Sequence, residues 1–357
     1  MKFSVDAKEF GSVLQRVAVA LPSKSPVAAL FCILIKATED GVILGATDLS
    51  FSVQFGIPKT KVNVLKTGCW AVPGKSLIDV VSMATGTLEV EFDGNMVHLT
   101  HGRSKIRLVA MPGDDYPNLS YGHESLAFSR VPSKDFVGAL SSVSWSCSRD
   151  ETRPILCGVC CNDKEFASTD GHRMTVLSHS LPITAEHIIP QTSVDRLSKV
   201  VFTEEVGFHF STSDLYVLSG SALITVRLTA GKFLDYSMIM PKRNDKKVIV
   251  NRADLKESLD RALILADKEQ RTAIINYADK KIVLASRSEK SGEVEDSLRC
   301  HEDSSAEPIK IGFNAKYLVE MLSVVRDDTV VFNFADGLSP LLVQEGKLRH
   351  VVMPKRI

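Results

Sequence analysis

The sequence has 357 residues, of which 44% are apolar and 24% are charged. This composition is typical of an ordinary soluble protein with two or three compact domains, and it excludes a largely disordered chain. Lysine plus arginine equals aspartate plus glutamate, at 43 each. The totals therefore carry no basic excess of the kind that marks many nucleic-acid-binding proteins.

The chain lacks the apolar segments and the cysteine pattern of an exported or membrane protein. Residues 1–6 contain no apolar run of signal-peptide length, and no later stretch approaches the roughly 20 residues that a membrane span needs. The seven cysteines are irregularly placed, which favours reduced thiols over a disulfide framework. We therefore expect a cytoplasmic protein that does not contact membranes.

The first third of the chain predicts a unit of helices and strands. Its opening helix starts at Asp6, which Glu9 answers three positions later as in a capping box. A second helix, an alternating strand over residues 88–92 and a strand that ends in Met111-Pro112 follow. The apolar helix faces contain Phe10, Val13, Leu14 and Val17, and then Leu77, Val80, Val81 and Ala84.

The middle third repeats this order. Its opening helix begins at Ser133, an alternating strand spans residues 206–210, and the unit ends at Met240-Pro241. The apolar run over residues 155–161 predicts a buried strand, on which alternation places Cys157 and Cys160 on opposite faces. The apolar helix faces contain Phe136, Leu140 and Val143, and then Val194, Leu197 and Val201.

The last third repeats the order again. Its opening helix starts at Asn251 with Asp254 three positions on, an alternating strand covers residues 330–334, and the closing strand ends in Met353-Pro354. The apolar helix faces contain Leu255, Leu259 and Ala262, and then Leu318, Met321, Leu322 and Val325.

Corresponding points recur about every 115 to 130 residues, which is a domain-sized period rather than that of a solenoid. The sequence therefore predicts three α+β domains, at residues 1–122, 123–245 and 246–357. The polar stretches over residues 113–123 and 242–247 are the predicted linkers.

Two local patterns suggest chemistry but are better explained by structure. The segment Gly74-Lys75-Ser76 looks like the end of a phosphate-binding loop, yet the glycine spacing back to Gly68 is one residue too long and the flanking order is wrong for a βαβ unit. Cys157 and Cys160 match a redox dithiol by spacing, but their apolar run favours core packing. No second Cys or His pair is spaced to complete a zinc site, so we predict neither a metal nor a cofactor.

The cluster from Ser168 to Arg173 is the most polar segment of the middle domain and raises the possibility of a hydrolase that uses His172 and Asp170. Residues of a triad normally converge from different elements, and nothing else supplies a nucleophile with a base. The first domain has the counterpart Ala46-Thr47-Asp48-Leu49, which favours a structural Thr-Asp turn. We predict no catalytic residue. A repeat scaffold that binds proteins but no DNA is the other alternative.

Several segments resemble the bacterial DNA polymerase III beta subunit family, the sliding clamps. The resemblance covers the whole chain and its threefold repeat. It rests on Met1-Lys2-Phe3, Ala46-Thr47-Asp48-Leu49, Thr169-Asp170-Gly171-His172-Arg173, Gly312-Phe313-Asn314 with Tyr317, and Val351-Val352-Met353-Pro354.

The resemblance implies a homodimeric ring in which two chains join head to tail. Six domains would place helices around a hole and antiparallel sheets outside, and the ring would encircle double-stranded DNA without reading its sequence. Such a ring is a non-catalytic processivity factor. Its implied partners are the replicative DNA polymerase, the clamp loader and other proteins with a clamp-binding motif.

The resemblance also implies a peptide groove between domains 2 and 3. Carried over position by position, the groove uses Leu156, Thr169, Gly171, His172, Arg173, Met174, Ile239, Asn314, Tyr317, Val351, Val352, Met353, Pro354 and Arg356. Branched and thioether side chains suit an adaptable apolar pocket, and polar rim groups can bind peptide backbone. Leu234, Met238 and Pro340 stand where relatives often have Pro, Arg and Ser, which puts the selectivity of the pocket in question.

For contacts with DNA, the resemblance places Lys24 and Arg149 on loops near the hole, with ordinary solvated bases as the alternative. The candidate inward helices are only mildly basic. Their bases are Lys8, Arg16, Lys75, Lys134, Arg196, Lys199, Arg252, Lys256 and Lys316, and their acids are Glu9, Asp79, Asp135, Asp195, Asp254, Glu257 and Glu320.

For the dimer, we expect domain 1 of one chain to contact domain 3 of the other. Lys105-Ile106-Arg107-Leu108 alternates basic and apolar residues on an expected edge strand, and Glu293 and Glu295 carry the opposite charge. Ile264 and Leu265 can add apolar packing. The alternative is that these are two solvated charged stretches, because exposed ion pairs contribute only about 0 to 1 kcal/mol.

Overall fold

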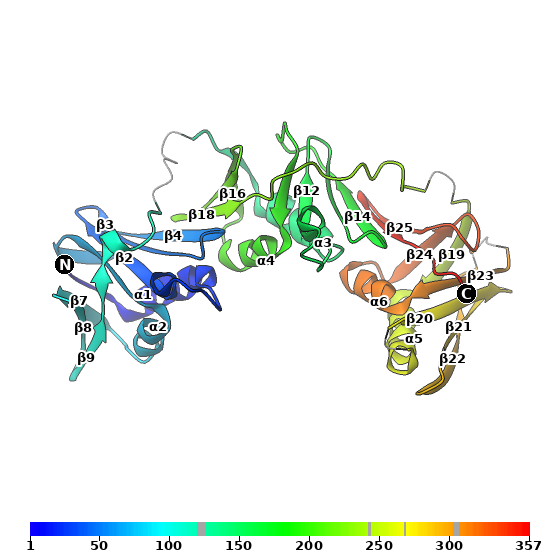
Figure 1. Cartoon of the computed structure of the whole chain (residues 1–357), viewed down its shortest axis with the longest axis horizontal. Helices are drawn as coiled ribbons and strands as arrows, with labels where there is room; N and C mark the ends of the chain where they lie inside the picture. Colours follow the sequence, from blue (N-terminus) through cyan, green and yellow to red (C-terminus); the bar gives the residue numbers. More distant parts are fainter. Residues whose placement is uncertain (120–125, 242–243, 268, 303, 305–306) are drawn as a thin grey trace. The chain divides into compact units, whose positions relative to one another are not determined.

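The structure is a computed structural model of residues 1–357, and it describes residues 1–119, 126–241, 244–267, 269–302, 304 and 307–357. The predicted boundary between residues 122 and 123 lies outside the described residues, as does part of each predicted linker. The contacts divide the chain into two units, drawn in Figure 1. The first unit holds residues 1–138 and 192–229, and the second holds residues 139–191 and 230–357.

The first unit contains two antiparallel sheets. The five-stranded sheet has the order β5 (Val62–Lys66), β1 (Lys2–Asp6), β7 (Thr87–Asp93), β8 (Met96–His101) and β9 (Ser104–Val109). The nine-stranded sheet has the order β10 (Met111–Pro112), β6 (Gly68–Pro73), β2 (Cys32–Thr38), β3 (Gly41–Thr47), β4 (Phe51–Pro58), β18 (Ala222–Arg227), β17 (Asp214–Ser219), β16 (Glu205–Phe210) and β11 (Ser129–Pro132). The helices here are α1 (Ala7–Val17), α2 (Gly74–Ser82) and α4 (Gln191–Val200).

The second unit has the same plan. Its eight-stranded sheet has the order β15 (His187–Pro190), β12 (Gly158–Cys161), β13 (Glu165–Thr169), β14 (Arg173–Ser178), β26 (Leu348–Val352), β25 (Leu341–Glu345), β24 (Thr329–Phe334) and β19 (Lys246–Asn251). Its four-stranded sheet has the order β22 (Gly292–Arg299), β21 (Lys281–Ser288), β20 (Thr272–Ala278) and β23 (Ile309–Asn314). The helices are α3 (Ala139–Ser144), α5 (Arg252–Leu265) and α6 (Ala315–Val324).

Each unit has one sheet that joins strands of two consecutive repeats. In the first unit, β4 pairs with β18 from Phe51↔Val226 to Phe55↔Ala222. In the second, β14 pairs with β26 from Arg173↔Val352 to Leu177↔Leu348. These two ladders place the predicted repeats edge to edge along continuous sheets, and the middle repeat contributes strands to both.

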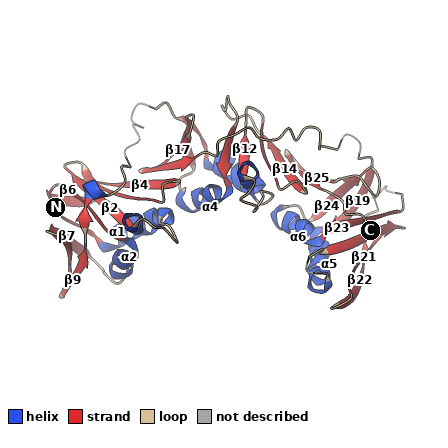
Figure 2. Ribbon diagram, in the orientation of Figure 1, coloured by secondary structure: helices blue, strands red, loops and turns tan. Residues whose placement is uncertain are grey.

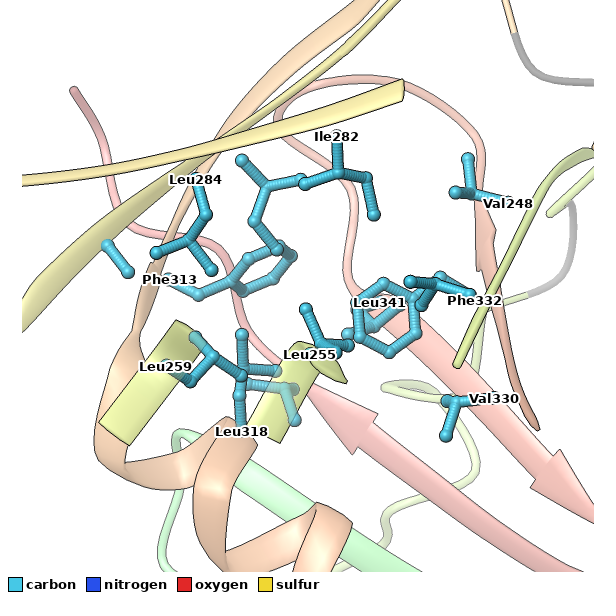
Figure 3. Packing of buried hydrophobic residues seen from close by; sticks show 14 of the residues in the cluster. Val248, Leu255, Leu259, Ile282, Leu284, Phe313, Leu318, Val330, Phe332 and Leu341 are labelled. Carbon is cyan, nitrogen blue, oxygen red and sulfur yellow. The ribbon is translucent and has the colours of Figure 1, made fainter. Parts of the chain in front are cut away.

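The predicted apolar faces form the cores. In the last repeat, α5 and α6 pack against each other and against the four-stranded sheet, and Leu255, Leu318 and Phe313 are fully buried among strand residues (Figure 3). Helix starts follow the predicted caps. Asp6 accepts hydrogen bonds from the backbone N–H groups of Lys8 and Glu9, and Asn251 accepts one from Asp254.

Several local predictions were wrong. The Glu9 carboxylate, which a capping box would direct to the backbone N–H of Asp6, instead pairs with Lys61 at 3.0 Å. The helical segment of the middle repeat does begin at Ser133, but Lys134–Gly138 form a π-helical turn before α3, and the Ser133 hydroxyl donates to the carbonyl of Thr203. Met240 and Pro241 lie in and after a turn, so only the first and last repeats place their Met-Pro pair in or directly after a strand.

The structure also decides the two local chemical motifs. Strand β6 ends at Pro73 and α2 begins at Gly74, so no phosphate-binding loop lies between them. The strand predicted from residue 155 begins only at Gly158, because Pro154–Cys157 form a 3-10 turn. All seven cysteines are free thiols. Burial raises the pKa of Cys160 to about 12, which is typical of a packing thiol rather than a reactive one.

No helix among the described residues is long and apolar enough to cross a membrane.

Candidate functional site

The β14–β26 ladder carries an apolar surface formed by two consecutive repeats. Met174 pairs with Val351 across the ladder, and the two residues are 2% and 1% exposed. Leu156 and Phe233 are buried in the same cluster, and Leu234 packs against it with partial exposure. We call Leu156, Met174 and Val351 the groove floor. Because side chains from residues 233–240 cover part of it, an incoming apolar residue must displace or slide between them.

The turn between β13 and β14 is held by its own Thr and Asp. The Thr169 hydroxyl donates to the carbonyl of Arg173 at 2.7 Å and accepts from the N–H of Gly171 at 3.0 Å. Asp170 accepts from the N–H groups of His172 and Arg173. Gly171 has a φ of +91°, which favours glycine. These contacts make Thr-Asp a turn element, as the repetition predicts.

The corresponding turn of the first repeat has the same design. Thr47 accepts from the N–H of Leu49, and Asp48 accepts from the N–H groups of Ser50 and Phe51. A turn that recurs without His or Arg supports a structural role for its Thr and Asp. The hydrolase alternative requires Asp170 as a catalytic group. Its carboxylate instead accepts hydrogen bonds from backbone N–H groups of its own turn, as Asp48 does in the first repeat, which argues against this alternative.

Arg173 is a buried cation at the centre of the site. Its side chain is 6% exposed, and its guanidinium lies 4.8 Å from the ring of Trp145 and 4.6 Å from that of Tyr317. It donates to Asp170 at 3.0 Å and also to Glu320 on α6. A buried guanidinium needs this many partners because desolvation is costly. Its hydrogen bonds are therefore already made inside the chain, which the sequence did not indicate.

The first ladder carries a different set of groups at the same positions. Phe51 occupies the ladder position of Arg173, and Arg196 on α4 lies 5.4 Å from its ring. Arg196 also pairs with Asp48. Arg196 lies two residues after the buried Val194 in α4, and Glu320 lies two residues after the buried Leu318 in α6. The position that carries a base in α4 therefore carries an acid in α6.

The groove floor is likewise specific to the second ladder. The positions of Met174 and Val351 are taken by Ser52 and Thr225 in the first ladder. Ser52 is buried there and hydrogen-bonded to Thr47 at 2.8 Å. Polar side chains that bond to each other offer no apolar anchor, so the positions of Met174 and Val351 suit an apolar peptide side chain and their counterparts in the first ladder do not.

The last residues of the chain complete the site. The N–H of Met353 donates to the carbonyl of His172 at 2.8 Å, and the N–H of Lys355 donates to the carbonyl of Gly312 at 2.7 Å. Met353 and Pro354 are half-buried, whereas Arg356 is exposed. Val352 is fully buried, so it supports the site from below rather than lining it. These bonds hold the chain end against both neighbouring repeats.

Most predicted groove residues therefore gather in the second unit. His172 stacks on Tyr317 with ring centroids 6.4 Å apart, and Asn314 caps α6 by accepting from the N–H of Lys316. Ile239 is 38% exposed in the turn before Met240. A cavity of about 490 Å³ adjoins His172, Arg173, Asn314 and Tyr317. Sequence reasoning missed this cavity, whose other walls come from loops far apart in the chain.

The two predicted DNA contacts lie in different units. Lys24 is exposed on a loop of the first unit, and Arg149 is exposed at the cavity in the second. Exposure alone suits phosphate contact and simple solvation equally well. Among the described residues, no group of three or more His, Cys, Asp or Glu side chains is arranged to hold a metal ion.

The predicted seam residues occupy two sheet edges. Strand β9 is an edge of the five-stranded sheet, where Lys105 and Arg107 are exposed and Ile106 and Leu108 are half-buried. Strand β22 is an edge of the four-stranded sheet, with Glu293 and Glu295 exposed. In α5, Ile264 is 76% exposed and Leu265 is half-buried. Both are edge strands; β9 exposes Lys105 and Arg107, whereas β22 exposes Glu293 and Glu295 and also Arg299 at its end.

A buried histidine beside the floor should make stability depend on pH. His350 pairs with Thr175 across the β14–β26 ladder, and burial lowers the pKa of its ring to about 4. The unfolded chain binds a proton below about pH 6.5 and the folded chain does not, so stability falls as the pH drops from 6.5 towards 4. At pH 5 the loss should be about 2 kcal/mol.

The measurement is urea unfolding of the wild type and of His350→Gln at pH 7 and pH 5. The Gln side chain does not titrate and can still hydrogen-bond to Thr175. We expect the wild type to lose stability relative to the variant as the pH falls. Equal losses in both proteins would contradict a buried neutral His350.

Comparisons with known proteins agree over the full length. Family models for the N-terminal, central and C-terminal domains of the DNA polymerase III beta subunit match residues 1–120, 130–235 and 237–356. A beta sliding clamp of Chlamydia pneumoniae is 26% identical over 100% of this chain and 99% of its own length. One of Staphylococcus epidermidis is also 26% identical over 100% of this chain and 99% of its own length.

Solved structures share the fold. A Bacillus subtilis sliding clamp aligns with a TM-score of 0.93 at 23% identity, covering 100% of this chain and 99% of its own. The beta subunit of Streptococcus pyogenes aligns at 0.94 with 24% identity, and a Pseudomonas aeruginosa clamp bound to griselimycin aligns at 0.91 with 23%. Both cover 100% of each chain.

Proposed function

The chain belongs to the DNA polymerase III beta subunit family, the beta sliding clamps, and from this premise we propose that two copies form a closed ring around duplex DNA. The family is that of a processivity subunit rather than of a catalytic one. The function proposed for this chain is to tether the replicative polymerase to DNA. The proposed compartment is the cytoplasm, and residues 1–122, 123–245 and 246–357 are the proposed domains.

The ring proposal rests on one observation. Two edge strands correspond to the two partners of the ladders that join repeats inside the chain, and neither has a partner strand among the described residues. The ladders β4–β18 and β14–β26 each join the third sheet strand of one repeat to the last strand of the next. Counted within each sheet in the same way, β22 is the third strand of the last repeat and β9 is the last strand of the first, with the two-residue β10 following it in the other sheet. Both are free edges, so β9 of one chain and β22 of another can make the junction that recurs inside the chain.

The charges of the two strands and their exposed edges support this pairing. The β9 edge presents Lys105 and Arg107, and the β22 edge presents Glu293 and Glu295. A long exposed edge strand is an aggregation hazard unless it is covered, and a ring closed through β9 and β22 covers both of these edges. A head-to-tail contact that closes after two copies gives six domains in one ring.

The partner groove is proposed at the second ladder. Its apolar floor is Leu156, Met174 and Val351, and its rim is formed by His172, Tyr317 and the residues from Met353 to Arg356. A clamp loader, the replicative polymerase and other proteins with a clamp-binding motif would place an extended apolar peptide there. The polar Ser52 and Thr225 at the equivalent positions of the first ladder explain why one such groove per chain is proposed.

The test of the proposed function is particle mass and shape. Sedimentation should give twice the chain mass of 39.1 kDa, and negative-stain electron microscopy should show a toroid with a hole wide enough for duplex DNA. A compact monomer, or an open filament of many copies, would contradict the proposal.

A further inference from the structure

The cavity of about 490 Å³ beside the groove is built from four segments of the second unit. The loop after α3 supplies Arg149 and Arg153, and the turn before β14 supplies His172 and Arg173. Arg271 lies just before β20, and Lys316 lies in the first turn of α6. The sequence pointed to His172 and Tyr317 for the groove and to Arg149 for DNA, but no pattern grouped these segments around one cavity. The cavity arises only when the second and third repeats fold together.

The charges around this cavity are unequal. Its acids are Asp150, Asp170 and Glu269, whereas its bases are Arg149, Arg153, Arg173, Arg271 and Lys316. Asp170 and Arg173 bind each other at 3.0 Å, which removes one charge of each sign. Glu320 on α6 also binds Arg173 and lies 3.6 Å from Lys316, so the positive excess that remains is carried mainly by the exposed Arg149 and Arg153.

The remaining pairs within the cavity are weak. The nearest atoms of Arg153 and Asp150 are 3.9 Å apart, and their side chains are 64% and 50% exposed. The Lys316 ammonium lies 3.6 Å from Glu320, whose other carboxylate oxygen binds Arg173. Exposed pairs of this kind contribute little and can exchange partners with an incoming anion. Arg149 and Arg153 are thus available to such a ligand.

The cavity shares residues with the proposed groove. His172 and Tyr317, whose rings stack on each other, line the cavity and are also the residues proposed for the groove rim. The carbonyl of His172 is bound by the N–H of Met353, and Val351 of the floor lies two residues before Met353. An extended peptide advances about 3.3 Å per residue, so the residues just beyond its anchored segment would reach the cavity.

We propose that this cavity binds a carboxylate side chain next to the anchored segment of a partner peptide, so that the chain prefers partners with an acidic flank. The proposal rests on the function proposed for the groove. A carboxylate is favoured over a DNA phosphate because Asp150 and Glu269 stand in the cavity wall. They oppose a continuous run of phosphates more than a single carboxylate that two arginines can bind together.

The test uses fluorescein-labelled peptides with one common apolar core that binds the intact protein. The core is extended at either end by Asp-Glu, by Asn-Gln or by Lys-Lys, and Kd is measured by anisotropy in low salt. At one end, Asp-Glu should bind the wild type about five- to tenfold more tightly than Asn-Gln. The double variant Arg149→Glu with Arg153→Glu should abolish this preference and favour Lys-Lys, while its affinity for the unextended core stays unchanged.

The matched control is Arg326→Glu, which reverses an exposed base on the turn after α6, away from the cavity. It should keep the preference for Asp-Glu. Equal affinity for Asp-Glu and Asn-Gln in the wild type would overturn the acidic-flank proposal and leave the groove intact. If the double variant kept the acidic preference but lost affinity for duplex DNA, the cavity would be a phosphate site instead. A core that fails to bind at all would overturn both the groove and this proposal.

Discussion

Chains that carry Ile106→Glu and Leu108→Glu should sediment as monomers where the wild type sediments as a dimer. Among the described strands, β9 pairs only with β8, and its other edge has no partner strand. Ile106 and Leu108 lie opposite Leu99 and Val97 in that pairing, so they extend the apolar face of the sheet towards the edge. Two carboxylates there would be buried without partners when β22 of a second chain pairs with β9, which opposes association.

Because Ile106 and Leu108 are half-buried, a charge-swap set separates loss of the seam from loss of folding. Lys105→Glu with Arg107→Glu changes only exposed side chains, and it should weaken the dimer by placing like charges opposite Glu293 and Glu295. Adding Glu293→Lys with Glu295→Lys should restore dimerisation. An unchanged dimer in the Ile106 and Leu108 variant, or no rescue by the second pair, would refute the β9–β22 seam.

The sequence predicted the elements of this fold because the signals for them are local. A helical apolar period, an Asp or Asn at a helix start and a Thr-Asp turn each need only a few neighbouring residues. The faces that begin at Phe10 and Leu255 are therefore buried as predicted, whereas Val80 and Ala84 of the face that begins at Leu77 are only half-buried. The threefold repeat strengthened the prediction of these elements, because each local signal appears again about one domain length later.

The electrostatic core of the site could not be predicted in this way. Arg173 and Glu320 are 147 positions apart in the chain, and only the packing of α6 against the β13–β14 turn brings them together. From the sequence, Arg173 next to His172 is predicted to be a second polar side chain on the groove rim. The structure instead buries the guanidinium and leaves the imidazole exposed. Which sheet edges pair is likewise a long-range outcome, since nothing in β14 alone indicates β26 as its neighbour.

The bases on the candidate inward helices are largely engaged within the chain. Arg196 pairs with Asp48, Lys256 with Asp260 and Lys316 with Glu320. Arg16 stacks on Phe202 at 3.7 Å. Each such contact competes with a phosphate for the cation. Together with zero formal net charge, this arrangement predicts weak direct affinity for DNA. Retention on DNA must then come from closure of the ring.

The central claim is encirclement, and it is tested most directly by retention on DNA of defined topology. The protein is loaded onto a nicked circular duplex by a clamp loader, separated from free protein by gel filtration, and washed in low and moderate salt. A protein held by six to ten phosphate contacts loses about 10³ to 10⁵ in affinity between about 50 and 200 mM salt, whereas a closed ring does not depend on those contacts.

We expect the loaded protein to stay on the circle through the salt wash and to leave when one restriction cut linearises the DNA, because a ring slides off free ends. Blocking both ends of the linear DNA with bound protein should restore retention. Loss from intact circles in moderate salt, or retention on linear DNA with open ends, would contradict encirclement.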